Sequence, residues 1–332
     1  TLLGPSGCGK TTTLRSIAGL EKPDSGRIKL GEQILFDGGA RVDRPVNRRG
    51  LAMVFQSYAI WPHMSVWKNA AFPLEISPRR SRPSGRQIKE RVHRALATVG
   101  LDGFADQSAT RLSGGQQQRL ALARALVIEP SVLLLDEPLS NLDAKLRENM
   151  RLELKRLQRD MGLTAIYVTH DQAEALSMSS RVAIMNAGKV VQIGRPRDIY
   201  GAPADEFVAD FLGVSNFVEG TVSEVGPELT EIQTDIGVFR TTSVDTITSG
   251  QAVLVCLRPE QLAVTMTRPS ATPVNEFEGK LLATAFLGDR VDHIVAIGGT
   301  EVRVRSHSAV RIRRDATVYL TIAAEDIVVL PR

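Results

Sequence analysis

Near the start of the chain stands the segment Gly4-Pro5-Ser6-Gly7-Cys8-Gly9-Lys10-Thr11, which matches the pattern G-x-x-x-x-G-K-[ST]. An apolar strand end, Leu2-Leu3, precedes it, and a helical pattern from Thr12 to Leu20 follows. Glycines let backbone N–H groups turn inward around phosphate oxygens, and the positive end of the helix points at the same place. The segment therefore predicts a P-loop. The alternative, a glycine-rich turn without a ligand, does not explain the strand and the helix beside it.

The side chains of this loop suit a nucleoside triphosphate. Lys10 can reach the β- and γ-phosphates, and the Thr11 hydroxyl can hold Mg²⁺. Cys8 is expected to fill space rather than act as a nucleophile, because no partner base is evident. The predicted phosphate-binding residues are Gly4, Pro5, Ser6, Gly7, Cys8, Gly9, Lys10, Thr11 and Thr12.

Two neighbouring acids end a second apolar segment, Val132-Leu133-Leu134-Leu135-Asp136-Glu137. Successive side chains of a strand point to opposite sides, so we expect the two carboxylates to have different roles. Asp136 suits the Mg²⁺ held by Thr11, and Glu137 is then free to polarise a water for attack on the γ-phosphate. The alternative is a pair of solvated acids that cap the strand, which the nearby P-loop disfavours.

A second candidate phosphate site is Leu112-Ser113-Gly114-Gly115-Gln116, which precedes a helical run from Leu120 to Leu126. Ser113 is a natural N-cap, and the two glycines let an anion approach the helix start closely. The alternative is an ordinary capped helix. One nucleotide has little use for two such ends from one chain, but two copies related by a two-fold axis would place each P-loop opposite its partner's helix end.

The organisation along the chain predicts two domains. Residues 1–212 alternate continuous apolar runs with helical patterns, which indicates an α/β domain with a largely parallel sheet. Strand signals stop between about 58 and 111, where we predict a mostly helical insertion that contains a helix from Ser84 to Val99. Residues 213–332 carry short strand-like segments instead, typical of an all-β domain.

The β-rich region contains a faint internal repeat. Asn216-Phe217-Val218-Glu219-Gly220 is similar to Asn275-Glu276-Phe277-Glu278-Gly279, and Pro259–Val264 is similar to Ala324–Val329. We interpret this as two small related barrel-like units, with chance similarity as the alternative.

Composition narrows the class of protein. A hydrophobic content of 43% and a charged content of 23% are those of a globular protein. No stretch reaches the ~18 apolar residues that a membrane-spanning helix needs, and Cys8 and Cys256 make no disulfide framework. The chain opens at the end of a strand, so we expect further sequence before Thr1.

The motifs together resemble those of the ATP-binding subunits of ABC transporters. The P-loop is followed by Gln56, Leu-Ser-Gly-Gly-Gln, Leu-Leu-Leu-Asp-Glu-Pro, Ser140-Asn141-Leu142-Asp143 and Thr169-His170-Asp171, which is that family's order. The resemblance covers residues 1 to about 212. It implies a RecA-like P-loop NTPase core that hydrolyses ATP with Mg²⁺ and works as a head-to-tail homodimer.

The resemblance also assigns roles to individual residues. It implies that Gln56 senses Mg²⁺ and the attacking water, that Asp143 communicates across the dimer, and that His170 contacts the γ-phosphate. With these, the predicted catalytic residues are Glu137, His170 and Gln56; the metal ligands are Thr11, Gln56 and Asp136; and the partner's ATP contacts Ser113, Gly114, Gly115, Gln116 and Asp143. The family's adenine-stacking aromatic lies upstream of the P-loop, so either the chain is truncated or adenine binding is weakened.

From Gly213 onward the chain resembles the OB-like regulatory β-domain of importer ATPases, on the motifs Leu257-Arg258-Pro259-Glu260 and Phe286-Leu287-Gly288. The resemblance implies uptake of sugars, polyamines, ferric iron, phosphonates or similar solutes. Its expected setting is the cytoplasmic face of the membrane, beside permease subunits and, indirectly, a solute-binding protein. The aromatic-rich stretch from Tyr58 to Met64 is expected to receive a permease helix, with simple core packing as the alternative.

Two other functions use similar motifs. A nucleic-acid-linked ATPase would carry long coiled-coil insertions or two ATPase units, and no basic groove is evident, so we expect no nucleic-acid partner. A module that binds ATP without turnover is disfavoured by the complete catalytic set.

Overall fold

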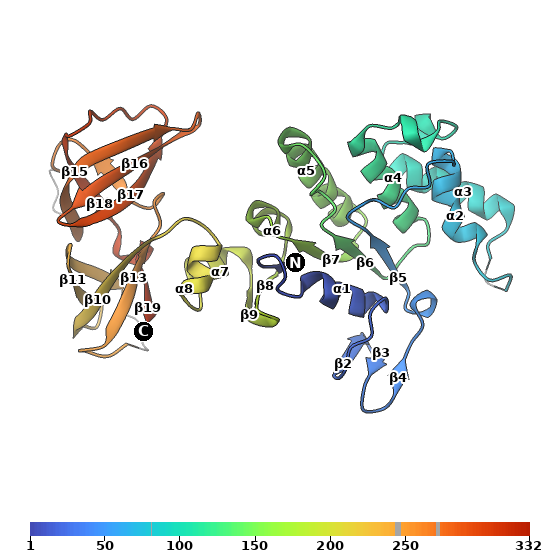
Figure 1. The fold of residues 1–332 in the computed structure, drawn as a ribbon, viewed down its shortest axis with the longest axis horizontal. Coiled ribbons are helices and arrows are strands. Elements are labelled where there is room, and N and C mark those ends of the chain that lie inside the picture. Colours follow the sequence, from blue (N-terminus) through green and yellow to red (C-terminus); the bar gives the residue numbers. More distant parts are fainter. Residues whose placement is uncertain (81, 243–246, 270–272) are drawn as a thin grey trace. The chain divides into compact units, whose positions relative to one another are not determined.

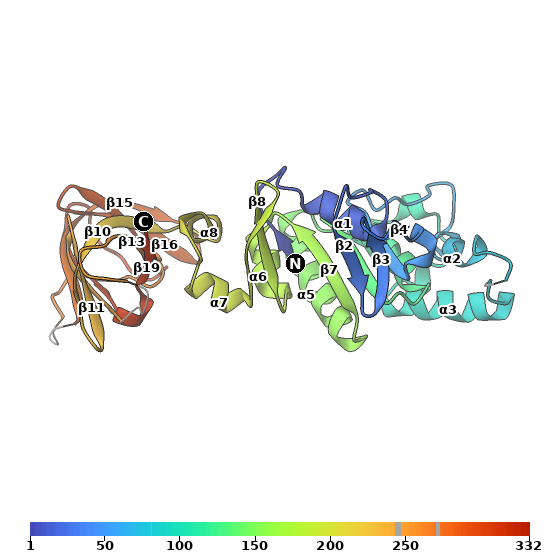
Figure 2. The ribbon, with the colours of Figure 1, turned by 90° about the horizontal axis from the view of Figure 1, so that it is seen from below.

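The computed structural model describes residues 1–80, 82–242, 247–269 and 273–332, which form two compact units, Thr1–Pro196 and Arg197–Arg332 (Figures 1 and 2). The predicted domain boundary after residue 212 stays a prediction. The elements of the first unit are β1 (Leu2–Leu3), α1 (Lys10–Ala18), β2 (Arg27–Leu30), β3 (Gln33–Asp37), β4 (Val42–Asp43), β5 (Leu51–Val54), α2 (Val66–Glu75), α3 (Gly85–Thr98), α4 (Gly114–Leu126), β6 (Val132–Asp136), α5 (Ala144–Asp160), β7 (Thr164–Thr169), α6 (Gln172–Met178), β8 (Val182–Asn186) and β9 (Lys189–Gly194).

A six-stranded sheet in the order β5-β6-β7-β1-β8-β9 organises the first unit. Its pairs are parallel except for the edge strand β9, which runs antiparallel to β8. The register places Leu2 of β1 opposite both Val168 of β7 and Ala183 of β8. The predicted α/β core is therefore confirmed.

Strand β6 is buried along its whole length because helices cover both faces of the sheet. Leu133 and Leu135 pack in the cluster that contains α4 and α5. Val132 and Leu134 point the other way and pack on Leu14 of α1. This alternation explains the continuous apolar run and directs Asp136, the next residue on the α1 face, toward the P-loop helix.

The expected helical insertion contains α2, α3 and three-residue 3₁₀ turns at Asp102–Phe104 and Ala109–Arg111. Helices α2, α3 and α4 pack together beside the β5 edge of the sheet (Figure 1). Ser84 caps α3 through a reciprocal pair of bonds with Gln87, which fixes the start of the predicted helix. Among the described residues, no strand lies between β5 and β6.

The C-terminal end of α1 is held by a buried arginine. Arg49 is 1% exposed, and its guanidinium donates to the carbonyl oxygens of Ser16 and Ile17 at 2.8 and 2.9 Å. The same group donates to the Arg44 carbonyl at 2.8 Å and to the Asp43 carboxylate at 3.1 Å. A cation at this end of a helix satisfies otherwise free carbonyl groups and opposes the macrodipole. Arg49 therefore anchors the helix whose other end carries the P-loop.

The second unit opens with short helices and continues as two five-stranded antiparallel sheets. Its elements are α7 (Pro196–Gly201), α8 (Glu206–Phe211), β10 (Asn216–Val225), β11 (Leu229–Thr234), β12 (Gly237–Thr242), β13 (Ala252–Leu257), β14 (Ala263–Thr265), β15 (Asn275–Phe286), β16 (Arg290–Ile297), β17 (Thr300–His307), β18 (Thr317–Ile322) and β19 (Val328–Pro331). Both sheets share one hydrophobic core, in which the tilted rings of Phe239 and Phe277 pack at 4.5 Å between their centroids. The all-β character predicted for this region is confirmed.

The two sheets repeat one another and exchange a strand. Their orders are β12-β11-β10-β13-β19 and β17-β16-β15-β18-β14, so the fifth strand of each repeat lies in the sheet of the other. Strands β10 and β15, which begin with the similar sequences, also bulge at matching places, between Val222 and Glu224 and between Leu281 and Ala283.

The first residue of each repeat ties one sheet to the other. The side-chain amide of Asn216 donates to the Arg303 carbonyl at 2.8 Å and accepts from the Arg303 N–H at 2.7 Å. Asn275 makes the same two bonds with Arg240, at 2.8 and 2.7 Å. The similar asparagines noted in the sequence are therefore matched crosslinks between β10 and β17 and between β15 and β12.

A buried histidine lies in the second sheet. His293 of β16 is 0% exposed and its ring nitrogens face the hydroxyl groups of Thr284, at 3.3 Å, and Ser306, at 2.8 Å. Burial lowers the pKa of His293, and the nearby Asp292 carboxylate opposes this only in part. Its burial makes His293 a packing residue of this sheet. No helix in the described residues is both long and apolar enough to cross a membrane.

Replacing Arg49 with Ala is expected to reduce the free energy of unfolding of the first unit by about 3 kcal/mol, because the helix carbonyls lose a buried charged donor. Urea unfolding followed by tryptophan fluorescence measures this unit alone, since Trp61 and Trp67, the two tryptophans of the chain, both lie in it. The neighbouring Arg48 is exposed, so Arg48→Ala should change the value by less than about 0.5 kcal/mol. Equal effects of the two changes would contradict the anchoring role.

The second unit is expected to lose stability as the pH falls below the ordinary histidine pKa of 6.5. In that range the unfolded chain binds a proton at His293 that the folded unit resists, so protonation favours unfolding. Hydrogen exchange of the β15–β17 amides should accelerate from pH 7 to pH 5, and His293→Gln should flatten this dependence. The exposed His307, changed to Gln, serves as the control and should leave it in place.

Candidate active site

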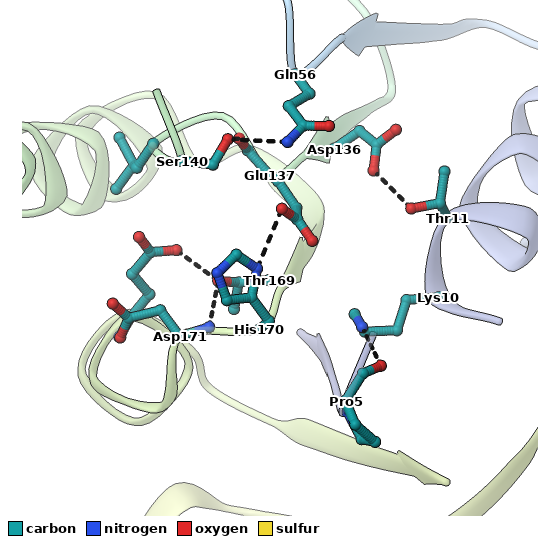
Figure 3. Close-up of polar contacts among 12 residues, drawn as sticks. Pro5, Lys10, Thr11, Gln56, Asp136, Glu137, Ser140, Thr169, His170 and Asp171 are labelled. Carbon is teal, nitrogen blue, oxygen red and sulfur yellow. Dashed lines mark hydrogen bonds and ion pairs between the residues drawn. The ribbon is translucent and has the colours of Figure 1, made fainter. Parts of the chain in front are cut away.

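The carboxyl ends of three neighbouring parallel strands meet at one edge of the sheet. The P-loop follows β1, Asp136 ends β6 and is followed by Glu137, and Thr169 ends β7 and is followed by His170. This edge is where open α/β sheets bind their ligands, and the strand order β6-β7-β1 brings the predicted motifs together there. Figure 3 shows Lys10 and Thr11 of α1 facing the side chains from the sheet.

The P-loop backbone has the form that phosphate binding requires. Gly9 adopts φ 97°, a left-handed conformation open to glycine, at the N-cap of α1. Gly4 lies so close to Met185 that an added Cβ would meet its carbonyl oxygen at 2.2 Å. The ammonium group of Lys10 donates to the carbonyl oxygens of Gly4 and Pro5, both at 2.8 Å. The lysine side chain is thus folded back over the loop. Cys8 is 3% exposed and fills space, as expected.

A hydrogen bond between Thr11 and Asp136 joins α1 to the end of β6. The Thr11 hydroxyl donates to the Asp136 carboxylate at 3.1 Å, as β6 and α1 together dictate. Burial raises the pKa of Asp136, and the neighbouring Glu137 carboxylate adds to the rise, while the Thr11 bond opposes it. A buried carboxylate beside a hydroxyl offers the hard oxygen ligands that Mg²⁺ prefers, and a cation there would offset the desolvation. These two residues fit the predicted metal position.

Glu137, the first residue after β6, departs from strand geometry. Its φ is 43°, and such a conformation in a non-glycine residue costs about 1–3 kcal/mol. Three hydrogen bonds hold it: its N–H donates to the Val168 carbonyl at 3.0 Å, and its own carbonyl accepts from the Ser140 N–H at 3.2 Å and hydroxyl at 2.9 Å. The carboxylate reaches the Nδ1 atom of His170 at 3.1 Å (Figure 3). Because β6 ends at Asp136, the strand alternation on which different roles for the two acids were expected does not extend to Glu137.

His170 is placed by a buried cluster around Glu174. The hydroxyl groups of Tyr167 and Thr169 both donate to the Oε2 atom of Glu174, at 2.8 and 2.7 Å. Thr169 in turn accepts from the backbone N–H of Asp171 at 2.9 Å, so both neighbours of His170 are fixed (Figure 3). Burial, followed by the Glu174 charge, raises the pKa of Tyr167, which keeps its phenol protonated and donating.

Gln56 completes the arrangement from β5. The side-chain amide of Gln56 donates to the Ser140 hydroxyl at 3.3 Å. The backbone carbonyl of Gln56 accepts from the Asn141 side-chain amide at 2.8 Å. A cavity of ≈ 300 Å³ lies among these groups. Its lining consists of Thr11, Arg15, Phe55, Gln56, Ser57, Asp136, Glu137 and Asn141. The candidate metal ligands and the candidate base therefore surround one space beside the P-loop.

The remaining predicted site residues lie elsewhere in the unit. Ser113 is exposed at the start of α4 and forms a capping box with Gln116. Asp143 is exposed and caps α5 by accepting from the Leu146 N–H at 2.9 Å. Neither lines the cavity. The predicted nucleotide contacts of these two helix starts therefore stay predictions.

Sequence reasoning left out residues that the structure places at the site. Arg15 lines the cavity and acts electrostatically on Asp136. It follows Thr11 by one helical turn, and this i, i+4 spacing would have identified it. Ser140 and Asn141 were noted as part of a motif, but their bonds to Glu137 and Gln56 depend on the folded turn.

Comparison with known proteins gives two family matches: the family described as "ABC transporter" over residues 1–140, and the "TOBE domain" over residues 255–330. The chain is 48% identical to the Fe(3+) ions import ATP-binding protein FbpC 1 of Rhizobium meliloti, over 89% of this chain and 79% of that protein. It is 46% identical to the spermidine/putrescine import ATP-binding protein PotA of Marinobacter nauticus, over 91% and 78%. Among solved structures it is similar to cbiO1 from Clostridium perfringens, part of the ABC transporter complex cbiONQ (TM-score 0.53, 29% identity, 60% of this chain and 77% of that one).

The strain at residue 137 can be measured directly. Glu137→Gly is expected to be more stable than Glu137→Gln by about 1 kcal/mol, because glycine adopts a φ of 43° without strain. Urea unfolding followed by tryptophan fluorescence compares the two variants, and both lack the carboxylate, so its charge does not enter the comparison. A glycine variant no more stable than the glutamine variant would show that the backbone here is unstrained.

Proposed function

The chain belongs to the ABC transporter family of ATPases, and we propose that it is the ATP-hydrolysing subunit of an importer, working with Mg²⁺ as a homodimer on a membrane permease. The observation that supports this best is the convergence of Thr11, Asp136, Glu137 and Gln56 on one cavity beside the P-loop. Relatives of nearly equal identity are named for ferric iron and for polyamines. The proposal therefore stays at the importer class and leaves the choice of solute to the permease and, through it, a solute-binding protein.

The residues divide the work of hydrolysis. The P-loop N–H groups and Lys10 hold the phosphates, and Lys10 exchanges its carbonyl contacts with Gly4 and Pro5 for the triphosphate oxygens. Thr11, Asp136 and Gln56 would hold Mg²⁺, which supplies charge neutralisation of the phosphates. Glu137 accepts a proton from the attacking water, and His170, at 3.1 Å from Glu137, lies within reach of the γ-phosphate.

A second copy of the chain supplies what one copy lacks. Ser113, Gly114 and Gly115 open a helix of 13 residues, and this exposed N-terminus favours an anion. A two-fold axis would place it over the partner's phosphates, with Gln116 and Asp143 at the same interface. ATP then joins the two copies, and hydrolysis removes the contacts that hold them together.

An apolar groove beside β5 is proposed to receive a cytoplasmic helix of the permease, which would keep the subunit at the inner face of the membrane. The groove has a volume of ≈ 420 Å³. It is lined by Ala18, Leu20, Val46, Leu51, Ala52, Met53, Phe55, Ala59, Trp61, Phe72, Pro73, Ile76, Arg124, Ala125, Ile128 and Leu134. Four of these apolar side chains, Leu20, Val46, Ile76 and Ile128, are substantially exposed, as in a groove that binds an amphipathic helix.

Glu137→Gln tests the assignment of the base. The variant should bind ATP with Mg²⁺ as the native chain does. Its kcat should fall to roughly one hundredth of the native value or below, because the amide does not accept the proton. Light scattering should then detect an ATP-dependent dimer that persists. Glu148→Gln, at an exposed position of α5, should hydrolyse ATP normally. Unimpaired turnover in Glu137→Gln would refute the proposed role of Glu137.

A further inference from the structure

Arg124 of α4 joins this helix to the turn that follows Gln56. Its guanidinium donates to the Tyr58 carbonyl at 2.7 Å and also to the Ala59 carbonyl. The same group lies over the Trp61 ring, 4.6 Å from the centroid. Half-buried and desolvated, the guanidinium has a lowered pKa, yet an arginine keeps its charge under these conditions. Three contacts from one rigid planar group fix the turn relative to α4.

The two carbonyl groups belong to a strained stretch of backbone. Tyr58 and Ala59 have φ values of 59° and 45°, and neither is a glycine. Side chains rarely adopt this region, and it persists when the surroundings hold the backbone there. Tyr58 is buried, and its hydroxyl has no hydrogen-bond partner within the described residues, so its side chain supplies packing rather than a polar tether. The side-chain hydrogen bonds to the two carbonyl groups of this turn come from Arg124.

The strained turn starts directly after the active-site segment. The N–H of Tyr58 donates to the Phe55 carbonyl at 3.0 Å, so the turn encloses Gln56. On its other side Gln56 is bonded to Ser140 and Asn141, which follow Glu137. Gln56 is exposed and lines the cavity, so its position depends on these two attachments. Releasing the turn from α4 would leave it held from one side.

We propose that Arg124 is a positioning residue for ATP hydrolysis, which holds the left-handed turn at Tyr58–Ala59 and thereby places Gln56 over the cavity. This inference rests on the proposed function and adds to it a residue outside the nucleotide motifs. Arg124 does not line the cavity itself, so it acts through Gln56 and leaves the P-loop contacts with ATP unaltered.

The test is a kinetic double-mutant cycle on the full chain. Arg124→Lys keeps the charge but cannot bind two carbonyl groups and stack on Trp61 at once. It should lower kcat about tenfold and leave KM for ATP within about twofold, and Gln56→Ala should do the same. The double variant should be no slower than Gln56→Ala alone, because both changes remove one function. Arg151→Lys is the matched control: this partly buried arginine of α5 pairs with Glu148 at 2.5 Å and should keep the native kcat.

A rescue separates positioning from general loss of structure. Glycine adopts a φ of 45° without strain, so adding Ala59→Gly to Arg124→Lys should recover most of the lost kcat. A kcat of Arg124→Lys equal to the native value, losses that multiply in the double variant, or no recovery with Ala59→Gly would each overturn the proposal. Far-UV circular dichroism checks that each variant is folded, because Arg124 contacts Trp61 and its replacement alters tryptophan fluorescence directly. Arg124→Gln, which keeps two donors, replaces Arg124→Lys if that variant is not folded. A native chain that hydrolyses no ATP would instead refute the proposed function.

Discussion

The parallel pairing of β6, β7 and β1 is the constraint on which the site depends. Because these strands run in one direction, their carboxyl ends deliver the P-loop, the two acids and His170 to a single edge. The register matters as much as the order. A slip of β6 by one residue would turn Asp136 away from α1 and present Glu137 to Thr11 instead.

Around this edge, the backbone is held in conformations that side chains alone would not select. Glu137, Tyr58 and Ala59 are left-handed, and each is restrained by hydrogen bonds from a neighbouring element. The carboxylate proposed as the base and the glutamine are thus attached to turns that hydrogen bonds within the chain hold in place. Ser140 links the two, since its hydroxyl donates to the Glu137 carbonyl and accepts from Gln56. Such preorganisation lets the site stabilise a transition state without first ordering itself.

The sequence predicted the α/β core, the β-rich second region and, from two recognisable motifs, that Thr11 and Asp136 share a Mg²⁺ position. Loop glycines, capping residues and strand-end acids can be recognised from a few consecutive residues. The contacts of Arg124 and Arg49 could not be predicted in this way, because each joins residues far apart in the chain and binds backbone carbonyls, which any residue type supplies. The positive φ of Glu137 could not be predicted either, because the residue at this position is neither glycine nor asparagine.

The exchanged strands of the second unit make its two repeats mutually dependent. During synthesis the first repeat emerges with β10 to β13 available, but the strand that flanks β13 is β19, at the far end of the unit. The fifth strand of the first repeat, β14, cannot pair until β18 has been synthesised. Neither half can complete its sheet until the whole unit has been made, so folding waits on contacts of long sequence separation. Deleting either repeat would therefore leave the other repeat's sheet without its fifth strand.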